Sequence, residues 1–278
     1  MSSLTEAIEG KTKIITPFKN VSNIGVVTAK DDITAGDGAK HDIMSGKAKL
    51  ATRTTCNVFD FLHKGKIPLA YIGRDTPTTF LTWVCSMIPI EVVVRFVATG
   101  SYLKRNPDIT DGTVFDEPVV EFFYKTNGQK FGNQGIGCDD PLMVINDKGD
   151  NFNLYYPHKP IDHNGYVANS SSVYSSSETG SLTSKLIICR KLALSATSCL
   201  DVAWQFLGGE LYDLKFEFGI RPDGDQIVLA DVVDCDSWRV MWNGIQLSKQ
   251  PYRDGVEVEE ILDIYRLAAS LTDRFTIL

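Results

Sequence analysis

Apolar and charged residues alternate along residues 209–221, which have the sequence GELYDLKFEFGIR. One set of alternate positions is apolar: Tyr212, Leu214, Phe216, Phe218 and Ile220. The other set places two acids around one base: Asp213, Lys215 and Glu217. Successive side chains of a strand point to opposite faces, so the pattern predicts a strand with one apolar face and one charged face.

The charged face of this strand has two interpretations. Half-buried antiparallel strands commonly expose a polar face to water, and mixed charges are ordinary there. Alternatively, the face is the floor of a cleft that binds a metal ion and a polyphosphate. Carboxylates are the hard oxygen ligands that Mg²⁺ prefers, and an ammonium group offsets phosphate charge. The strand alone leaves both interpretations open.

The N-terminal third of the chain has the pattern of short strands around one helix. Four segments rich in β-branched or aromatic residues predict strands: KTKIIT, GVVTAK, LAYIG and TFLTWV. Residues 45–68 have a helical apolar stripe that includes Phe59 and Leu62, followed by Gly65 as a stop signal. A long strand is predicted next, over residues 87–102.

The middle of the chain is rich in glycine, asparagine and serine. We expect residues 126–184 to form loops, with the serine-rich tract as a mobile surface loop rather than a linker or phosphorylation site. Beyond it, the periodicity predicts a helix over residues 185–209, which Gly208 and Gly209 close. The strand of residues 209–221 and a returning strand, QIVLADVV, then form a hairpin, and residues 256–275 form a last helix.

Composition narrows the class of protein. The chain has 278 residues, 43% hydrophobic and 23% charged, which is typical of a soluble globular protein. A net charge of −7 disfavours a nucleic-acid polymer as partner. The six cysteines occur singly, and neither a signal peptide nor a membrane span is predicted, so we expect reduced thiols in the cytoplasm.

Four segments contain residues suited to binding phosphate or metal. GKTK places Lys11 and Lys13 on the same side of a predicted strand, where an anion would relieve their repulsion. DDITAGDGAK is a turn-rich loop whose backbone N–H groups could hold a polar ligand, although a plain hairpin loop fits equally well. RFVATGSYLKR combines Arg95 with Ser101 at a predicted turn, and LADVVDCDSWR contains Asp231 and Arg239.

These segments together, in this order, resemble the SAICAR synthetase (phosphoribosylaminoimidazole-succinocarboxamide synthase) family of purine biosynthesis. The matching segments are GKTK, DITAGDGAK, PIEVVVRFVATGSYLKR, CDDPL, LYDLKFEFG and LADVVDCDSWR. The resemblance implies a two-lobed α+β fold with mainly antiparallel sheets, related to the ATP-grasp and kinase folds. Residues 1–86 would form a β-rich ATP-binding lobe. Residues 87–278 would form a larger lobe with the nucleotide-substrate site and the C-terminal helix.

The resemblance also implies a reaction and its site residues. A ligase of this family uses ATP and Mg²⁺ to join the carboxylate of an aminoimidazole carboxylate ribonucleotide (CAIR) to the amine of L-aspartate, and a homo-oligomer is left open. The implied ATP contacts are Lys11 and Lys13. The implied metal ligands are Glu217 and Asp231, and the implied catalytic residues are Lys215, Asp213 and Lys125. The implied substrate contacts are Arg95, Ser101, Arg239, Thr34, Ala35, Asp37 and Asp140.

Three departures from the family pattern leave the substrates open. Asp139, Val232 and Cys235 stand where the family usually has histidine, an acid and proline. A paralogous ligase with another amine or carboxylate, a phosphotransferase without amide formation and a non-catalytic nucleotide binder are the alternatives.

The hairpin that carries the two expected metal ligands leads to a geometric prediction. A two-residue turn would place Asp231 opposite Phe216, on the apolar face. A three-residue loop at 223–225 would place it opposite Glu217, with Val232 on the apolar face. We therefore predict an odd-length or bulged hairpin.

Overall fold

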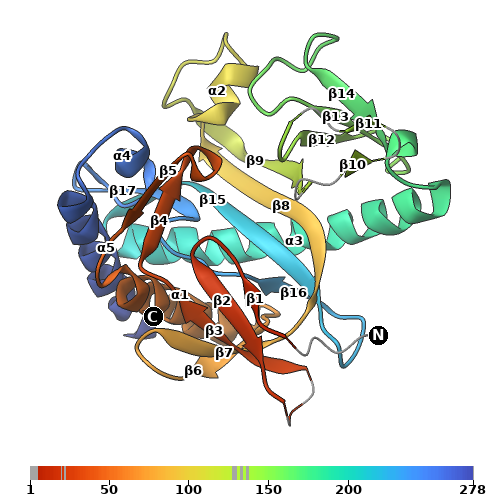
Figure 1. Ribbon diagram of the computed structural model, residues 1–278. Coiled ribbons are helices and arrows are strands. Elements are labelled where there is room, and N and C mark those ends of the chain that lie inside the picture. Colours follow the sequence, from red (N-terminus) through yellow and green to blue (C-terminus); the bar gives the residue numbers. More distant parts are fainter. Residues whose placement is uncertain are drawn as a thin grey trace. The chain divides into compact units, whose positions relative to one another are not determined.

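The computed structural model describes residues 6–19, 21, 23–126, 130–131, 134–135 and 138–277 (Figure 1). The chain forms two compact units. The first unit comprises residues 1–86, 196–211 and 219–278, and the second comprises residues 87–195 and 212–218. These units differ from the two predicted lobes, because the C-terminal residues group with the N-terminal sheet.

The first unit contains a five-stranded antiparallel sheet of order β1–β2–β3–β7–β6. Its strands are β1 (Ile8–Glu9), β2 (Lys13–Pro17), β3 (Ile24–Ala29), β6 (Tyr71–Arg74) and β7 (Thr79–Trp83). A separate hairpin pairs β4 (Asp32–Ala35) with β5 (Lys40–Ile43) around the short helix η1 (Gly36–Gly38). The predicted N-terminal strands are thus present, with ends shifted by a few residues.

Helix α1 (Lys47–Lys64) begins and ends where local chemistry allows it. Gly46 has a φ of 94°, in the left-handed region that favours glycine. The carboxylate of Asp31 accepts the N–H groups of Gly46 at 3.2 Å and Ala48 at 2.8 Å, which satisfies donors that a helix start leaves unpaired. The predicted inward residues Phe59 and Leu62 are buried, and Gly65 follows the last helical residue.

The C-terminal part of the first unit combines short strands with helices. Its elements are β16 (Ile227–Ala230), β17 (Trp238–Trp242), β18 (Ile245–Gln246), α4 (Gln250–Arg253), α5 (Val258–Thr272) and η3 (Asp273–Ile277). Three aromatic rings from these residues and helix α3 (Ser176–Phe206) meet edge to face: Trp204 lies 5.3 Å from both Trp238 and Phe275. This aromatic cluster joins residues far apart in sequence into one core.

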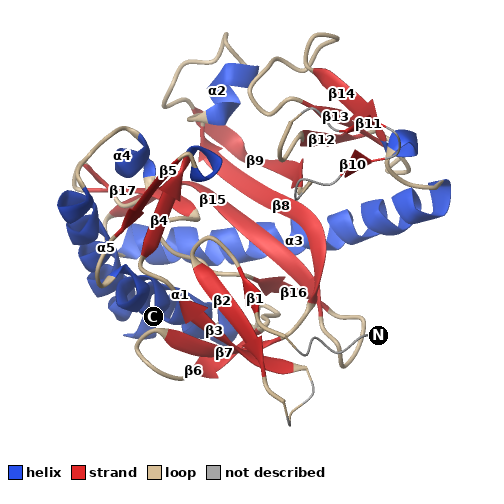
Figure 2. Cartoon of the chain, in the orientation of Figure 1, coloured by secondary structure: helices blue, strands red, loops and turns tan. Residues whose placement is uncertain are grey.

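The second unit is built on consecutive antiparallel strands in the order β14–β13–β12–β9–β8, with β15 next to β8. The strands are β8 (Ser86–Val97), β9 (Val114–Tyr124), β12 (Leu142–Ile145), β13 (Phe152–Tyr155), β14 (Tyr166–Asn169) and β15 (Gly209–Ile220). The short helix α2 (Ser101–Arg105) follows β8, and β10 (Lys130–Phe131) pairs with β11 (Gln134–Gly135). Figure 2 distinguishes these strands from the helices.

The prediction of loops over residues 126–184 is wrong. Strands β12, β13 and β14 lie there, and so do the short helix η2 (Ser170–Ser172) and the first turns of α3 (Ser176–Phe206). Ser175 and Glu178 form a capping box, because Glu178 Oε2 accepts the N–H of Ser175 at 2.9 Å while Ser175 Oγ accepts the N–H of Glu178 at 3.4 Å. The serine-rich tract therefore starts a helix.

The predicted three-residue loop at 223–225 is also wrong, whereas the bulged form of the hairpin stays a prediction. The N–H of Arg221 donates to the carbonyl of Gln226 at 2.9 Å, which leaves the even-length loop 222–225. Alternation along the returning strand does not reach Asp231, because β16 ends at Ala230. Asp231 has a φ of 67°, outside the strand region, so the strand register does not set its direction.

The helices show no membrane-spanning character. Among the described residues, no helix has the combination of length and apolar sequence that crossing a bilayer requires.

Candidate active site

The charged face predicted for β15 is present in the structure. Leu214, Phe216 and Phe218 are buried apolar residues, whereas the intervening side chains contact charged groups of neighbouring strands. Glu91 and Arg95 of β8 supply part of those contacts. Alternation along two adjacent strands therefore gathers acids and bases on one side of the sheet.

One end of this face carries a group that we call the lysine cluster: Glu91, Lys125, Lys215 and Glu217. Lys215 Nζ lies 2.8 Å from Glu91 and 3.2 Å from Glu217, and Lys125 Nζ lies 2.8 Å from Glu217. Lys125 directly follows β9, and its N–H donates to the carbonyl of Pro89 at 2.9 Å. The structure thus brings together three predicted site residues, Lys125, Lys215 and Glu217.

The acids of the lysine cluster keep Lys215 charged, and both lysines are partly accessible. Burial by itself lowers the pKa of Lys215, but Glu91 and Glu217 outweigh it and leave that pKa above its ordinary value. The side chains of Lys125 and Lys215 are nevertheless 25% and 31% exposed. Two lysines and two acids balance each other here, and a ligand can still reach both lysines.

The other end of the face carries the arginine cluster: Arg95, Arg105, Glu121 and Asp213. Arg95 Nε donates to Glu121 at 2.7 Å and Nη1 donates to Asp213 at 2.5 Å, while Nη2 lies 3.5 Å from Ser101 Oγ. Arg105 also pairs with Glu121. Burial lowers the pKa of Arg105, and Glu121 offsets part of this effect. All four side chains are buried. The guanidinium of Arg95, which was predicted to bind phosphate, donates to two carboxylates.

The two N-terminal lysines do not share a strand face as predicted. Lys13 is the first residue of β2, whereas Lys11 lies in the bend before it, so the period-two argument does not apply to Lys11. Lys13 forms an ion pair with Asp231. A predicted phosphate ligand and a predicted metal ligand therefore neutralise each other within the first unit.

The remaining predicted substrate contacts lie on strands and turns. Thr34 and Ala35 are on β4, at the end next to η1, and are partly buried; the side chain of Asp37 lies outside the described part of the structure. Asp140 precedes β12 and has a φ of 43°. Arg239 is on β17, with Nη2 at 3.4 Å from Gln250 Oε1.

The predicted phosphate site and the predicted metal site each combine residues of different units, so both stay predictions. Arg239 belongs to the first unit, whereas Arg95 and Ser101 belong to the second. Asp231 and Glu217 are divided in the same way.

A second group of charges, in part buried, was not predicted from the sequence. The loop cluster consists of Lys47, Asp234, Asp236, Lys249 and Tyr265. Both lysine Nζ atoms lie 3.6 Å from Asp236, and the Tyr265 hydroxyl donates to the same carboxylate. Burial raises the pKa of Asp234 to about 6, with Asp236 adding to the rise and Lys47 opposing it. Burial favours a neutral Asp236, yet Lys47 and Lys249 hold its pKa below the usual range.

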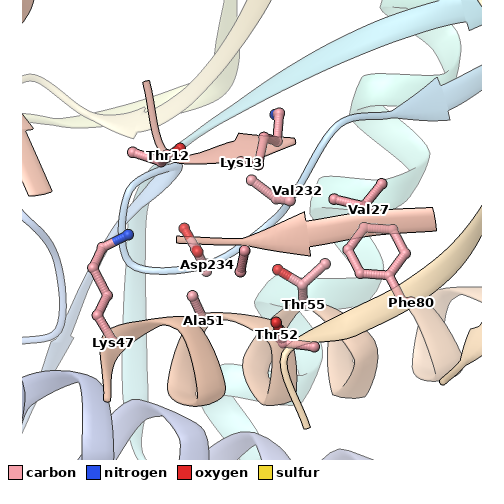
Figure 3. A pocket seen from close by; sticks show the side chains of 11 residues that line it. Thr12, Lys13, Val27, Lys47, Ala51, Thr52, Thr55, Phe80, Val232 and Asp234 are labelled. Atoms are coloured by element: carbon pink, nitrogen blue, oxygen red, sulfur yellow. The ribbon is translucent and has the colours of Figure 1, made fainter. Parts of the chain in front are cut away.

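Part of the loop cluster lines a pocket between β2, β3, α1 and the residues after β16 (Figure 3). The polar lining includes Thr12, Lys13, Lys47 and Asp234, and the apolar lining includes Val27, Phe80 and Val232. Figure 3 shows the Lys47 side chain reaching from α1 toward the end of the pocket where Asp234 lies. Val232, predicted on the apolar face of a strand, instead lines this mixed pocket.

The missed residues differ in the sequence signal that they gave. Glu91 stands at an alternate position of the apolar strand β8, so its pairing with β15 could have been proposed. Lys47 and Asp234 gave no comparable signal, because they meet only through the tertiary fold.

Comparison with known proteins gives the class to which this architecture belongs. The sequence model of the SAICAR synthetase family matches residues 6–134 and 168–263. A phosphoribosylaminoimidazole-succinocarboxamide synthase of Chloroflexus aurantiacus is 36% identical over 275 residues, which cover 96% of this chain and 95% of that protein. The corresponding Roseiflexus enzyme is 33% identical over 273 residues, with 95% of each chain covered.

Solved structures agree with the sequence relatives. The phosphoribosylaminoimidazole-succinocarboxamide synthase of Ehrlichia chaffeensis superposes with a TM-score of 0.74 at 25% identity, covering 98% of both chains. A type-2 SAICAR synthetase in complex with ADP gives a TM-score of 0.72 at 25% identity, with 96% of this chain and 97% of that chain covered. The fold is therefore the α+β, mainly antiparallel fold that the resemblance implied. The chain belongs to the SAICAR synthetase family.

Proposed function

We propose that the chain is an ADP-forming carboxylate–amine ligase that joins the CAIR carboxylate to the amine of L-aspartate. Its products would be SAICAR, ADP and phosphate. The family match and the names of relatives that cover nearly the whole chain support this reaction. The alternatives of a paralogous ligase or a phosphotransferase are not favoured, because no relative cited above has such a name.

The lysine cluster is the structural observation that carries the proposal. A carboxylate is a poor electrophile, so the reaction first needs transfer of a phosphoryl group to it. A carboxylate oxygen of CAIR would attack the γ-phosphorus of ATP, and ADP would leave. Two partly exposed ammonium groups, Lys125 and Lys215, are suited to stabilise the charge on the transferring group.

The second step forms the amide bond. The aspartate amine would attack the carbonyl carbon of the acyl phosphate, phosphate would leave with the electrons of the C–O bond, and the amine would lose a proton. The contribution of the chain is positioning and charge neutralisation. Asp213 would act indirectly, because its carboxylate is bound to Arg95 on the same sheet face.

We assign nucleotide binding to Lys11 and Lys13. Glu217 and Asp231 would hold Mg²⁺. The donors fit the ion, since both are carboxylates and Mg²⁺ is commonly held by one or two carboxylates together with substrate phosphates. Among the described residues, no group of three or more histidine, cysteine or acidic side chains is arranged to hold a metal alone. When bound, Mg²⁺ would neutralise charge on the phosphates.

Substrate binding is assigned to residues from both units. Arg95, Ser101 and Arg239 would hold the 5′-phosphate of the ribonucleotide, with Arg95 also orienting Ser101. The β4–β5 hairpin, with Thr34, Ala35 and Asp37, would approach the substrates, and Asp140 would lie near the nucleotide or the aspartate. Residues 1–86 would supply most of the ATP site, and residues 87–278 would supply the rest.

The test is a turnover assay with purified chain, ATP, Mg²⁺, CAIR and L-aspartate, in which ADP and the amide product are both measured. We expect ADP release to require CAIR and an amino acid, with L-aspartate best. Equal ADP release without an amine would indicate a phosphotransferase or an ATPase. Equal rates with another amino acid would indicate a paralogous ligase.

The cellular setting follows from the same proposal. Purine biosynthesis from small-molecule substrates requires neither a nucleic-acid polymer nor a membrane as partner. All six cysteines are free thiols, which suits a reducing cytoplasm. A homo-oligomer is compatible with this function, and light scattering of the purified chain would measure its state.

A further inference from the structure

The loop between β16 and β17 connects two residues of the proposed site. Asp231, a proposed metal ligand, begins the loop with a φ of 67°, and β17 after the loop carries Arg239. Few residues other than glycine adopt such a φ unless the surrounding structure holds them there. The contacts that fix this loop therefore affect how Asp231 is presented.

Hydrogen bonds hold the loop from within and to neighbouring elements. The N–H of Asp236 donates to Asp234 Oδ1 at 2.8 Å, and the N–H of Ser237 donates to the Asp234 carbonyl at 2.9 Å. The N–H of Lys249 donates to the Cys235 carbonyl at 2.8 Å. Thr55 Oγ1 of α1 donates to the Val233 carbonyl at 3.3 Å. Of these four bonds, two are local, and the one from Thr55 reaches α1.

The charged attachment to α1 is made by Lys47, whose location is unfavourable for a lysine. It is the first residue of the helix, where the helix dipole disfavours a cation, and its side chain is only 2% exposed. The helix start does not need it, because Asp31 already accepts the N–H groups there. Burial lowers the pKa of Lys47, but Asp236 and Asp234 outweigh it, so the lysine stays charged. The positive charge of Lys47 is thus stabilised by the acids of the loop.

We propose that Lys47 is a positioning residue that holds the loop of residues 231–237 through Asp236 and thereby fixes the proposed metal ligand Asp231. This inference rests on the proposed function. Lys249 and Tyr265 bind the same carboxylate, so Asp236 joins α1, the residue before α4, and α5 at the loop. Removing Lys47 would leave both Asp236 and the buried Asp234 with less compensating charge.

Direct ligand binding is the rival role for Lys47, because the residue also lines the pocket with Lys13. The two roles predict different losses. A positioning residue affects the extra affinity for ADP that Mg²⁺ supplies. A phosphate-binding lysine would contribute to ADP affinity with or without the metal.

The test compares Lys47→Met with Lys47→Arg, and with Lys49→Met as the control at an exposed position of the same helix. ADP binding is measured by calorimetry with Mg²⁺ and with a chelator. The ratio of ADP affinity with Mg²⁺ to ADP affinity in chelator measures the effect of the metal. In Lys47→Met we expect this ratio to fall by about tenfold or more, the usual result of removing a residue that orients a ligand. ADP affinity in chelator should change little. Lys47→Arg should recover most of the effect, and Lys49→Met should match the unchanged chain.

Hydrogen exchange provides a readout that does not depend on activity. In Lys47→Met, exchange should accelerate in peptides that contain the amides of Asp236 and Ser237, while the β2–β3 sheet keeps its protection. Uniform acceleration throughout the chain would indicate general destabilisation and would overturn the proposal. An undiminished Mg²⁺ effect in folded Lys47→Met, or an equal loss of ADP affinity in chelator, would also overturn it.

A milder variant covers the case in which Lys47→Met does not fold. Tyr265→Phe removes one hydrogen bond to Asp236 and should cause a smaller loss of the same kind, in both the Mg²⁺ effect and loop protection. No change in either measurement would count against the proposal. If the unchanged chain binds neither ADP nor Mg–ADP, the proposed function fails. If the unchanged chain binds Mg–ADP and the variants match it, this inference alone fails.

Discussion

The lysine cluster and the loop cluster contain the same charges but differ in access. Each contains two lysines and two acids, and each lysine in them is bound to an acid. In the lysine cluster, Lys125 and Lys215 are 25% and 31% exposed; in the loop cluster, Lys47 and Lys249 are 2% and 12% exposed. Equal charge therefore supports two roles: accessible lysines can meet a ligand, and buried lysines fix the backbone.

The arginine cluster provides the most demanding test, because it shares a sheet face with the lysine cluster but is buried like the loop cluster. If burial decides the role, Arg105→Met should mainly affect stability. Removing one partner of a buried ion pair typically costs about 3–5 kcal/mol. Here the buried Glu121 would lose one of its two cations and keep Arg95. Urea unfolding measures the loss. Adding Glu121→Gln should recover part of it, and a loss within error of zero would contradict this interpretation.

Lys215→Met tests the accessible side of the comparison. We expect kcat to fall by about 10²–10³-fold, the usual effect of removing one group that stabilises charge in a transition state. The unfolding free energy should change much less than in Arg105→Met, because the lysine side chain is partly solvated. Steady-state kinetics and urea unfolding measure the two effects. Lys104→Met, at an exposed position of the same unit, is the control.

Arg239→Ala tests whether β17, which follows the loop, serves the proposed substrate site. The KM for the carboxylate nucleotide should rise, with little change for ATP, because a charge-assisted contact to its phosphate would be lost. Such contacts are worth about 1.5–3 kcal/mol. A rise in the KM for ATP alone would assign Arg239 to the nucleotide cofactor instead.

Asp234→Asn should give the smallest effect, visible in the pH dependence of stability. Burial raises the pKa of Asp234 to about 6, so the folded chain binds this proton more tightly than the unfolded chain. Its ionisation therefore favours unfolding, and stability is lost as pH rises from about 4 through 6. Asparagine cannot ionise, so the variant should gain stability relative to the unchanged chain over that window. Unfolding at several pH values measures the difference, and a constant difference would contradict the assignment.

Local sequence rules account for much of the fold. Alternation located β15 and its charged face, and periodicity located α1 and most of α3. Composition predicts a loop for the serine tract, but the capping box of Ser175 and Glu178 starts a helix there. Strand alternation cannot place Asp231, because β16 ends at Ala230.

The site was predictable only where its residues lie on regular strands or in family motifs. Asp213, Lys215 and Glu217 share a face because the strand period is two. The partners of these residues, Glu91 and Arg95, depend on which strands are neighbours. Lys47 and Asp236 depend on how a helix start meets a loop nearly two hundred residues later, and no local pattern records that contact.

The ion pair between Lys13 and Asp231 favours ligands that bring an anion and a cation to the proposed site together. An anion that binds Lys13 alone leaves the Asp231 carboxylate without its ammonium partner. A cation that binds Asp231 alone leaves the Lys13 ammonium group without its carboxylate partner. A ligand that carries both charges replaces both partners together. The site would thus respond to a nucleotide and its metal jointly, and each would raise the affinity for the other by the same factor. Free nucleotide and free metal, which cells also contain, would each meet a site that is already satisfied.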